Sequence, residues 1–128
     1  ELLSYKRLDN IIFYAVNDTN VLDQLSGLED LNHLSINSGK ITSLKGISKI
    51  RGLDFLQIAT LSHLTDISEL TEMDSLQELW VNTCKYISSW EFLLEMKSLK
   101  KLSLFGCGKN RPNEKILSAL EESGVKVF

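Results

Sequence analysis

LNHLSI at residues 31–36 and LDFLQI at residues 53–58 are two copies of one pattern, and LQELWV at 76–81 and LKKLSL at 99–104 repeat it. Each copy reads L-x-x-L-x-(I/V/L), and the copies begin at positions 31, 53, 76 and 99, which are 22, 23 and 23 residues apart. A further step of 23 residues back gives LDNIIF at 8–13, and a step of 23 residues forward from Leu102 and Leu104 gives Val125 and Val127. Repeats of this length predict stacked structural units, each of which buries its apolar edge against its neighbours.

Two periodicities alternate within each unit. The end of each copy alternates apolar and variable residues, which predicts a short half-buried strand. Ahead of each copy, apolar residues recur at every third position, which is typical of a 3₁₀ turn or a tight extended coil rather than a 3.6-residue helix. The sequence therefore predicts a parallel sheet backed by short turns, whose core positions are Leu22, Leu25, Leu28, Leu44, Ile47, Ile50, Ile67, Leu70, Met73, Trp90, Leu93 and Met96.

The pattern resembles the leucine-rich-repeat family, and specifically its 22-residue subclass, which occurs in phosphatase regulatory subunits and bacterial internalins. That subclass reads L-x-x-L-x-L-x-x-N-x-I-x-x-I-x-x-L-x-x-L, and residues 31–50 follow it almost throughout. The resemblance covers about residues 8–109. It implies an α/β right-handed solenoid with a curved parallel β-sheet on the concave face and short 3₁₀ or coil segments on the convex face. It also implies a protein partner, without identifying one.

The ends of such a stack need caps, because otherwise they expose apolar edges. We expect one domain over residues 1–128 with about six coils, in which residues 1–7 form a partial N-terminal cap and residues 110–128 a C-terminal cap. The C-terminal cap is predicted to contain a short amphipathic helix over 113–123, with Pro112 in its first turn, and then an edge strand. Apolar edge strands at both ends are compatible with a monomer or with an end-to-end dimer.

Two cysteines stand where the family pattern has an asparagine that hydrogen-bonds the backbone. The ninth position of successive units holds Gly39, Leu61, Cys84 and Cys107. Because Cys84 and Cys107 are 23 residues apart, they should lie in adjacent coils and point inward as reduced structural thiols, with a disulfide as the alternative. A buried thiol without a cationic neighbour keeps a high pKa and is a poor nucleophile.

The variable strand positions should face away from the core. Four of them are large aromatics that folding does not require, and aromatic anchors among polar neighbours are typical of a protein-binding surface. The alternatives are that these rings stiffen the sheet by packing on one another, or that a further N-terminal segment covers them. The residues predicted to contact a partner are Tyr14, His33, Asn37, Phe55, Gln57, Glu78, Trp80, Asn82, Lys101 and Phe105.

Composition and motifs argue against several other functions. The 14 basic and 17 acidic side chains do not make the positive field of a nucleic-acid binder, and no apolar run approaches the roughly 20 residues that span a membrane. We expect neither a cofactor nor a metal site and no catalytic activity, since no phosphate loop, Cys-x-x-Cys or His-Glu-x-x-His motif occurs. Glu69, Glu72 and Asp74 fall at outward convex positions, where we expect solvating charges.

The leading hypothesis is a cytoplasmic, non-catalytic protein-binding module that acts through its concave sheet. One concrete form is an inhibitor or immunity-type protein that occludes a toxin or an enzyme. The alternative is a leucine-rich-repeat segment of a larger protein with a structural or targeting role, which the absence of an initiator methionine and the short N-terminal cap suggest.

Overall fold

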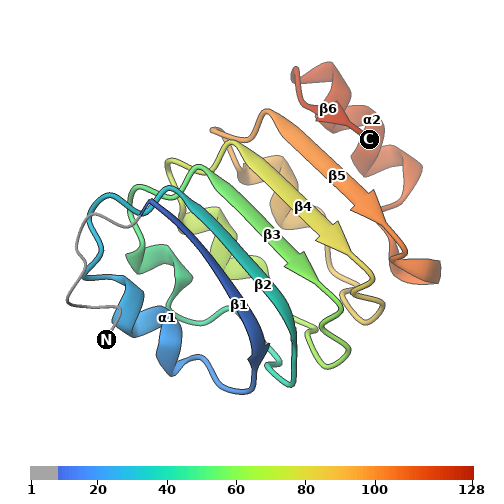
Figure 1. The fold of residues 1–128 in the computed structure, drawn as a ribbon. Coiled ribbons are helices and arrows are strands. Elements are labelled where there is room, and N and C mark those ends of the chain that lie inside the picture. The colour runs from blue at the N-terminus through green and yellow to red at the C-terminus, as the bar shows by residue number, and fades with distance from the viewer. Residues whose placement is uncertain (1–8) are drawn as a thin grey trace.

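The computed structural model describes residues 9–128, which form an α/β protein with a six-stranded, all-parallel sheet (Figure 1). Sheet order follows chain order, so that each strand lies between the preceding and the following one. The predicted N-terminal cap at residues 1–7 lies outside the described residues. The strands are β1 (Asn10–Val16), β2 (His33–Gly39), β3 (Phe55–Ala59), β4 (Glu78–Asn82), β5 (Lys101–Phe105) and β6 (Lys126–Val127).

The first five strands pair in the register that the sequence repeat predicts. Leu34 of β2 is opposite Leu56 of β3, which is opposite Leu79 of β4, and Leu79 is opposite Leu102 of β5. These pairs are separated by 22, 23 and 23 residues, as the repeats are. Equivalent leucines therefore form one continuous row across the sheet, and each of the four is fully buried.

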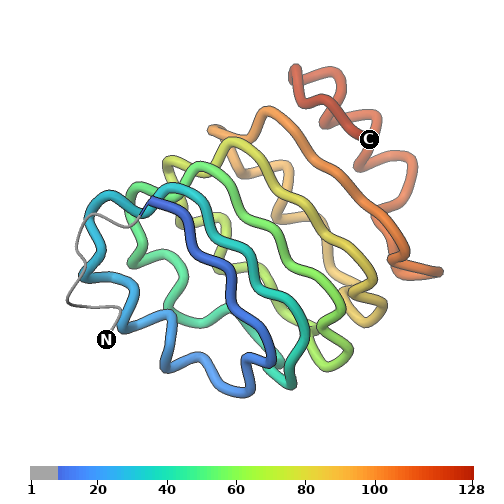
Figure 2. The backbone as a smooth tube through the Cα atoms, viewed as in Figure 1, coloured from blue at the N-terminus to red at the C-terminus, as the bar shows by residue number. Residues whose placement is uncertain are grey.

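Short helical segments lie behind one face of the sheet and connect each strand to the next (Figures 1 and 2). They are α1 (Asn20–Leu25), η2 (Ile47–Lys49), η3 (Ser68–Glu72) and η4 (Glu91–Glu95), where η denotes a 3₁₀ helix. Their hydrogen bonds explain the period of three, because the N–H of Ile47 donates to Leu44 and that of Ile50 donates to Ile47, at 3.0 and 3.1 Å. Every apolar position of the period-three pattern is buried.

The first of these segments differs from the prediction. Residues 20–25 form an α-helix rather than a 3₁₀ or extended segment. Leu22 and Leu25 are buried on it, three residues apart, and residues three apart share a face of an α-helix as well as of a 3₁₀ helix. A six-residue segment is too short for its apolar spacing to separate the two.

The C-terminal region contains the predicted helix and edge strand with two corrections. After η5 (Gly108–Asn110), helix α2 (Glu114–Glu122) has Asn113 as its N-cap, whose side chain accepts a hydrogen bond from the Ile116 N–H at 2.9 Å. Pro112 therefore precedes the N-cap and is not in the first turn. Gly124 ends the helix with a φ of +98°, a left-handed conformation that glycine adopts without a steric penalty.

The register of the last strand is also different from the one predicted. Lys126 is opposite Lys101 and Val127 is opposite Leu102, so the final step is 25 residues rather than 23. An α-helix advances about 1.5 Å per residue and a 3₁₀ helix about 2.0 Å, so the path through α2 takes more residues. Consequently Val127 replaces Val125 in the leucine row, and Phe128 follows β6 opposite Ser103, between the Leu102 carbonyl and the Leu104 N–H.

Candidate interaction surface

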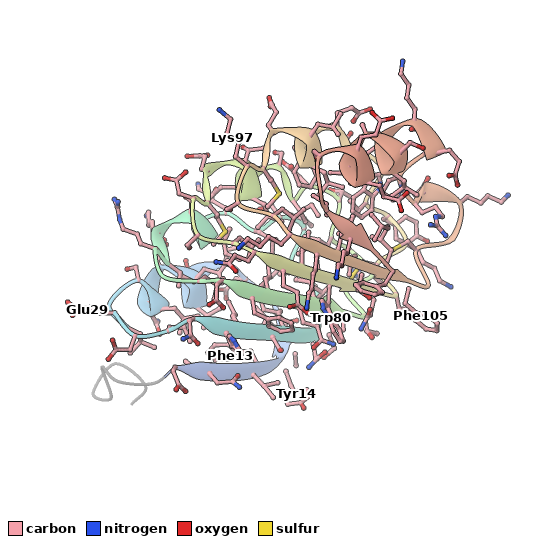
Figure 3. The ribbon with its side chains drawn as sticks, turned by 90° about the horizontal axis from the view of Figure 1, so that it is seen from above. Phe13, Tyr14, Glu29, Trp80, Lys97 and Phe105 are labelled. Carbon is pink, nitrogen blue, oxygen red and sulfur yellow. The ribbon has the colours of Figure 1, made fainter. Side chains whose placement is uncertain are left out.

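The strand residues that alternate with the core form the face of the sheet opposite the helical segments, which we call the open face. Tyr14, Trp80 and Phe105 project from this face (Figure 3). The strand register sorts it into three rows. The first contains Asn10, His33, Phe55, Glu78, Lys101 and Lys126; the second Ile12, Ser35, Gln57, Trp80 and Ser103; and the third Tyr14, Asn37, Ala59, Asn82 and Phe105.

Three of the predicted contact residues form one cluster at the centre of the open face. His33 and Phe55 are neighbours in the first row, with ring centroids 5.2 Å apart and planes tilted by 46°. Phe55 also meets Trp80 in an edge-on contact, at 5.8 Å and 62°. Trp80 keeps 38% of its surface exposed, so the indole is accessible from solvent. We call His33, Phe55 and Trp80 the aromatic cluster.

Glu78 holds the exposed tryptophan in place. The two residues are two apart on β4 and therefore project on the same side, and the indole Nε1 donates to the Glu78 Oε2 at 2.6 Å. Rings that are already oriented lose less conformational entropy when a partner covers them. Gln57 lies opposite Trp80 on β3 and is half-buried.

Two residues that the sequence interpretation missed complete a hollow beside the cluster. Asp54 and Gln77 directly precede β3 and β4, and the N–H of Gln77 donates to the Asp54 carbonyl at 2.8 Å. The hollow encloses about 390 Å³ and is lined by His33, Asp54, Phe55, Gln77 and Glu78. Each of these residues directly precedes a first-row residue, Asp54 before Phe55 and Gln77 before Glu78. The repeat position just ahead of each strand is therefore the sequence signal that identifies them.

The other predicted contact residues do not join this cluster. Tyr14 and Phe105 are 71% and 72% exposed, but they stand on β1 and β5, with the third-row residues of three strands between them. Four strand spacings of about 4.8 Å separate them by roughly 19 Å. Asn37 and Asn82 flank Ala59 in this row, and all three are at least half-buried. Lys101 is exposed, next to Glu78 in the first row.

Two small residues of the open face are less exposed than strand alternation predicts. Ser35 and Ala59 are 9% and 8% exposed. In the strand register Ser35 lies between Ile12 and Gln57, and Ala59 lies between Asn37 and Asn82. A short side chain between longer ones is covered by them.

Both cysteines are buried free thiols. Cys84 Sγ donates to the Asn82 carbonyl at 3.4 Å and Cys107 Sγ donates to the Val81 carbonyl at 3.8 Å. Burial raises the pKa of Cys84 to about 11 and also raises the pKa of Cys107. The thiols therefore stay protonated near neutral pH, which disfavours nucleophilic chemistry at either one.

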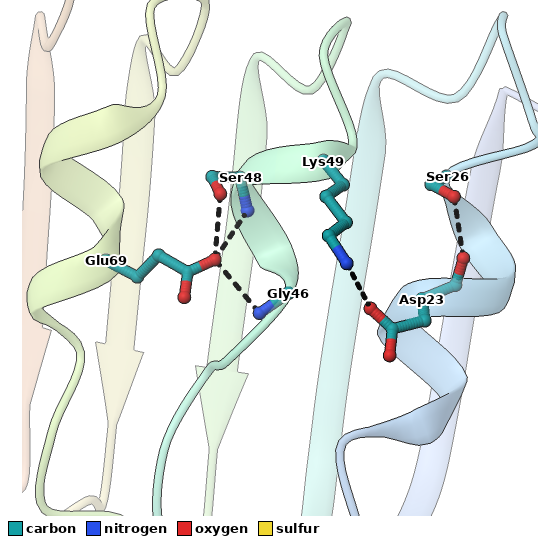
Figure 4. Close-up of polar contacts among 6 residues, drawn as sticks. All are labelled: Asp23, Ser26, Gly46, Ser48, Lys49 and Glu69. Carbon is teal, nitrogen blue, oxygen red and sulfur yellow. Dashed lines mark hydrogen bonds and ion pairs between the residues drawn. The ribbon is translucent and has the colours of Figure 1, made fainter.

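The opposite face shows that the predicted role of Glu69 was incomplete. Its Oε2 accepts hydrogen bonds from the Gly46 N–H, the Ser48 N–H and the Ser48 hydroxyl, at 2.9, 3.1 and 2.8 Å (Figure 4). The N–H groups at the start of a short helix lack partners within the helix, and a carboxylate satisfies them. Glu69 therefore links η3 to η2, whereas Glu72 and Asp74 are exposed, as expected.

Trp90, predicted to belong to the core, is buried, and its indole N–H donates to the Asn110 carbonyl. His33 and His63 lie on different parts of the molecule, since His63 follows β3 in a turn and its ring contacts Ser62. Within residues 9–128, no three His, Cys, Asp or Glu side chains are grouped as metal ligands would be.

No helix among these residues is long and apolar enough to cross a membrane. No protein-family model matches the sequence, and no curated protein matches it either.

Proposed function

We propose that the chain is a leucine-rich-repeat solenoid of the 22–23-residue subclass, with α2 and β6 as its C-terminal cap. The 22- and 23-residue offsets between paired strands support this proposal, as do the 3₁₀ segments at equivalent positions of three units. Helix α2 buries Ile116, Leu117 and Leu120. These side chains cover the end of the last unit, which would otherwise expose an apolar edge to solvent.

We propose that this solenoid is a non-catalytic protein-binding module and that its partner docks on the open face. The observation that carries the proposal is the aromatic cluster. His33, Phe55 and Trp80 contribute nothing to the core, yet they pack together in a fixed arrangement and leave the indole exposed. Partly exposed aromatic anchors with polar surroundings dominate binding energy at protein interfaces.

The mechanism that we propose is steric. A sheet held rigid by a continuous core can cover a surface of the partner without rearranging, as an inhibitor or immunity-type protein does when it occludes a toxin or an enzyme. Two free thiols fit a reducing compartment, and we propose the cytoplasm.

Site-specific photo-crosslinking tests this proposal. A photoreactive amino acid at Gln57, beside Trp80 on the open face, is compared with the same amino acid at Thr71, on η3 behind the sheet. In native lysate we expect one dominant cross-linked protein from position 57 and a much weaker product from position 71. The identity of the product would then be read by mass spectrometry.

Trp80→Ala provides the matched control for the anchor. In a chain with the cross-linker at position 57, this substitution should reduce the product by about tenfold or more, as expected for a hot-spot residue worth at least about 1.4 kcal/mol. Equal cross-linking from positions 57 and 71, or a product that Trp80→Ala leaves unchanged, would contradict docking on the open face.

A further inference from the structure

The hollow next to the aromatic cluster has a charge that packing within the chain does not explain. Two carboxylates, of Asp54 and Glu78, line it together with the carboxamide of Gln77, and no lysine or arginine of the described residues 9–128 does so. We propose that this hollow receives an arginine side chain of the protein partner. The inference rests on the proposed function and specifies what the partner must present to the open face.

The strand register places the groups of the hollow around a ring. Phe55 stands at the centre, with His33 in register on β2 and Glu78 in register on β4. Neighbouring strands are about 4.8 Å apart, so Glu78 lies one strand spacing from Phe55. Asp54 precedes Phe55 in the chain and Gln77 precedes Glu78, so both lie at the same edge of the sheet. Acceptors and an aromatic ring thus line one recess of about 390 Å³.

No lysine or arginine among residues 9–128 forms an ion pair with either carboxylate. Within residues 9–128, the ion-pair partner of Asp54 is His33, whose Nε2 is 3.5 Å from Oδ1. Glu78 accepts a hydrogen bond from the neutral Trp80 indole instead of pairing with Lys101, although Lys101 is opposite it on β5. The side chain of Asp54 is 43% exposed, so its acceptor positions can be reached from solvent.

Arginine fits these groups better than lysine does. A guanidinium is planar and can lie against an aromatic ring while its N–H groups donate to carboxylates on either side. It has five N–H donors, which match two carboxylates and one carboxamide, whereas a lysine ammonium has three donors and no planar face. Glu78 would contact the guanidinium from the start of β4, and Gln77 and Asp54 from the positions just before β4 and β3.

An NMR titration of the intact chain tests the site without the natural partner. The probe is Nα-acetyl-arginine-N-methylamide, and the matched control is the corresponding citrulline derivative, which has nearly the same shape and no charge. With the arginine probe we expect saturable chemical-shift changes in the backbone amides of residues 33, 54, 55, 77 and 78. The citrulline probe should bind at least about tenfold more weakly, because it lacks the charge-assisted hydrogen bonds.

Charge-matched variants locate the effect. Asp54→Asn and Glu78→Gln should each weaken the arginine probe by about tenfold, whereas Asp74→Asn and Glu72→Gln, which remove the same charge behind the sheet, should leave its affinity unchanged within about twofold. Both replacements in the hollow keep a side-chain oxygen, and Gln at position 78 can still accept from Trp80.

Three results would overturn the inference: no saturable shifts up to the solubility limit, equal binding of the citrulline probe, or equal losses in the two control variants. A partner that cross-links from Gln57 while the arginine probe fails would leave the proposed function standing and remove only the arginine site. Binding of the probe without any cross-linked partner would show that the hollow binds a guanidinium, but it would remove the protein partner that is proposed to supply it.

Discussion

The two faces of the sheet are made by the same five strands but follow different rules. On the core face the residue type repeats, so that Leu34, Leu56, Leu79 and Leu102 form one row that Ile11 and Val127 continue at its two ends. On the open face no row repeats, and one row changes from His33 to Phe55 to Glu78 in adjacent strands. The difference indicates that repetition determines the fold, whereas the departures from repetition make the surface specific.

Two adjacent residues of β4 test this division most strongly. Leu79 is fully buried in the leucine row, while Trp80 stands on the open face. Leu79→Ala should lower the free energy of unfolding by about 3 kcal/mol, because it removes buried methyl groups and leaves a cavity in a row packed on both sides. Trp80→Ala should lower it by less than about 1 kcal/mol, although it removes the larger side chain. Urea unfolding followed by circular dichroism measures both, and similar losses would mean that the open face also supports the fold.

The same division explains what could be predicted from the sequence. The period of two predicts the strands, and the period of three predicts which residues between them are buried. Both patterns are strict because a shift of a strand by one residue would expose its apolar side chains to solvent. Periodicity failed where a unit departs from its length. The last strand is displaced by two residues because α2 replaces a 3₁₀ segment, and six residues could not distinguish α1 from a 3₁₀ turn.

The candidate site was predicted only in part, because side-chain contacts across strands are not periodic. His33, Phe55, Glu78 and Trp80 were predicted as contacts, but the edge-on packing of Phe55 on Trp80 depends on rotamers. The alternation of a strand does not identify Asp54, because this carboxylate lines the hollow from the position just before β3. Residue type alone predicts Tyr14 and Phe105 as contacts as well, whereas the register places them at opposite ends of the third row.

The buried thiols allow a pH test of the core side of the comparison. The pKa of Cys84 is raised to about 11 by burial, whereas an unfolded cysteine has its ordinary value near 9. The unfolded state therefore loses its proton first as the pH rises. The stability that the protonated thiol contributes is complete below about pH 9 and is lost as the pH rises through 11; about 2 of the roughly 2.7 kcal/mol are lost by pH 11.

Cys84→Ala separates this loss from the titration of lysines, which falls in the same range. The difference in unfolding free energy between the variant and the original chain should change by about 2 kcal/mol between pH 8 and pH 11, as measured by urea unfolding. A difference that is independent of pH would show that Cys84 ionises as readily in the folded chain as in the unfolded one.

Glu69 tests whether repetition alone stabilises the side of the sheet that carries the helical segments. Its carboxylate accepts three hydrogen bonds from Gly46 and Ser48, and the neighbouring units have no equivalent contact among residues 9–128. Glu69→Ala should lower the free energy of unfolding by about 1.5 kcal/mol, because two backbone N–H groups of η2 lose their acceptor. Glu72→Ala, three residues away on the same 3₁₀ helix, should change it by less than about 0.5 kcal/mol. Equal effects would assign Glu69 the purely solvating role first expected of it.

The smallest expected effect concerns a position that repeats in conformation but not in residue type. One equivalent residue in each of the first five units, next to the last residue of its strand, has a positive φ. Four of these residues are not glycine: Ala15, Ser38, Thr60 and Thr83, at +57°, +64°, +57° and +53°. Gly106 holds the fifth such position, at +68°. A β-branched residue in this region is strained, so the fold imposes the conformation on whichever residue is there.

Thr60→Gly should therefore raise the free energy of unfolding by about 0.5 kcal/mol, because relief of strain outweighs the greater freedom of glycine in the unfolded chain. Thr60 is exposed, and its N–H bond to the Asn82 carbonyl would remain. Ser103→Gly, at a strand position without positive φ, should instead lower stability by about 0.5–1 kcal/mol. If both substitutions destabilised the chain equally in urea unfolding, Thr60 would not be strained, and the left-handed turn would be a preference of the local sequence rather than a requirement of the stacked units.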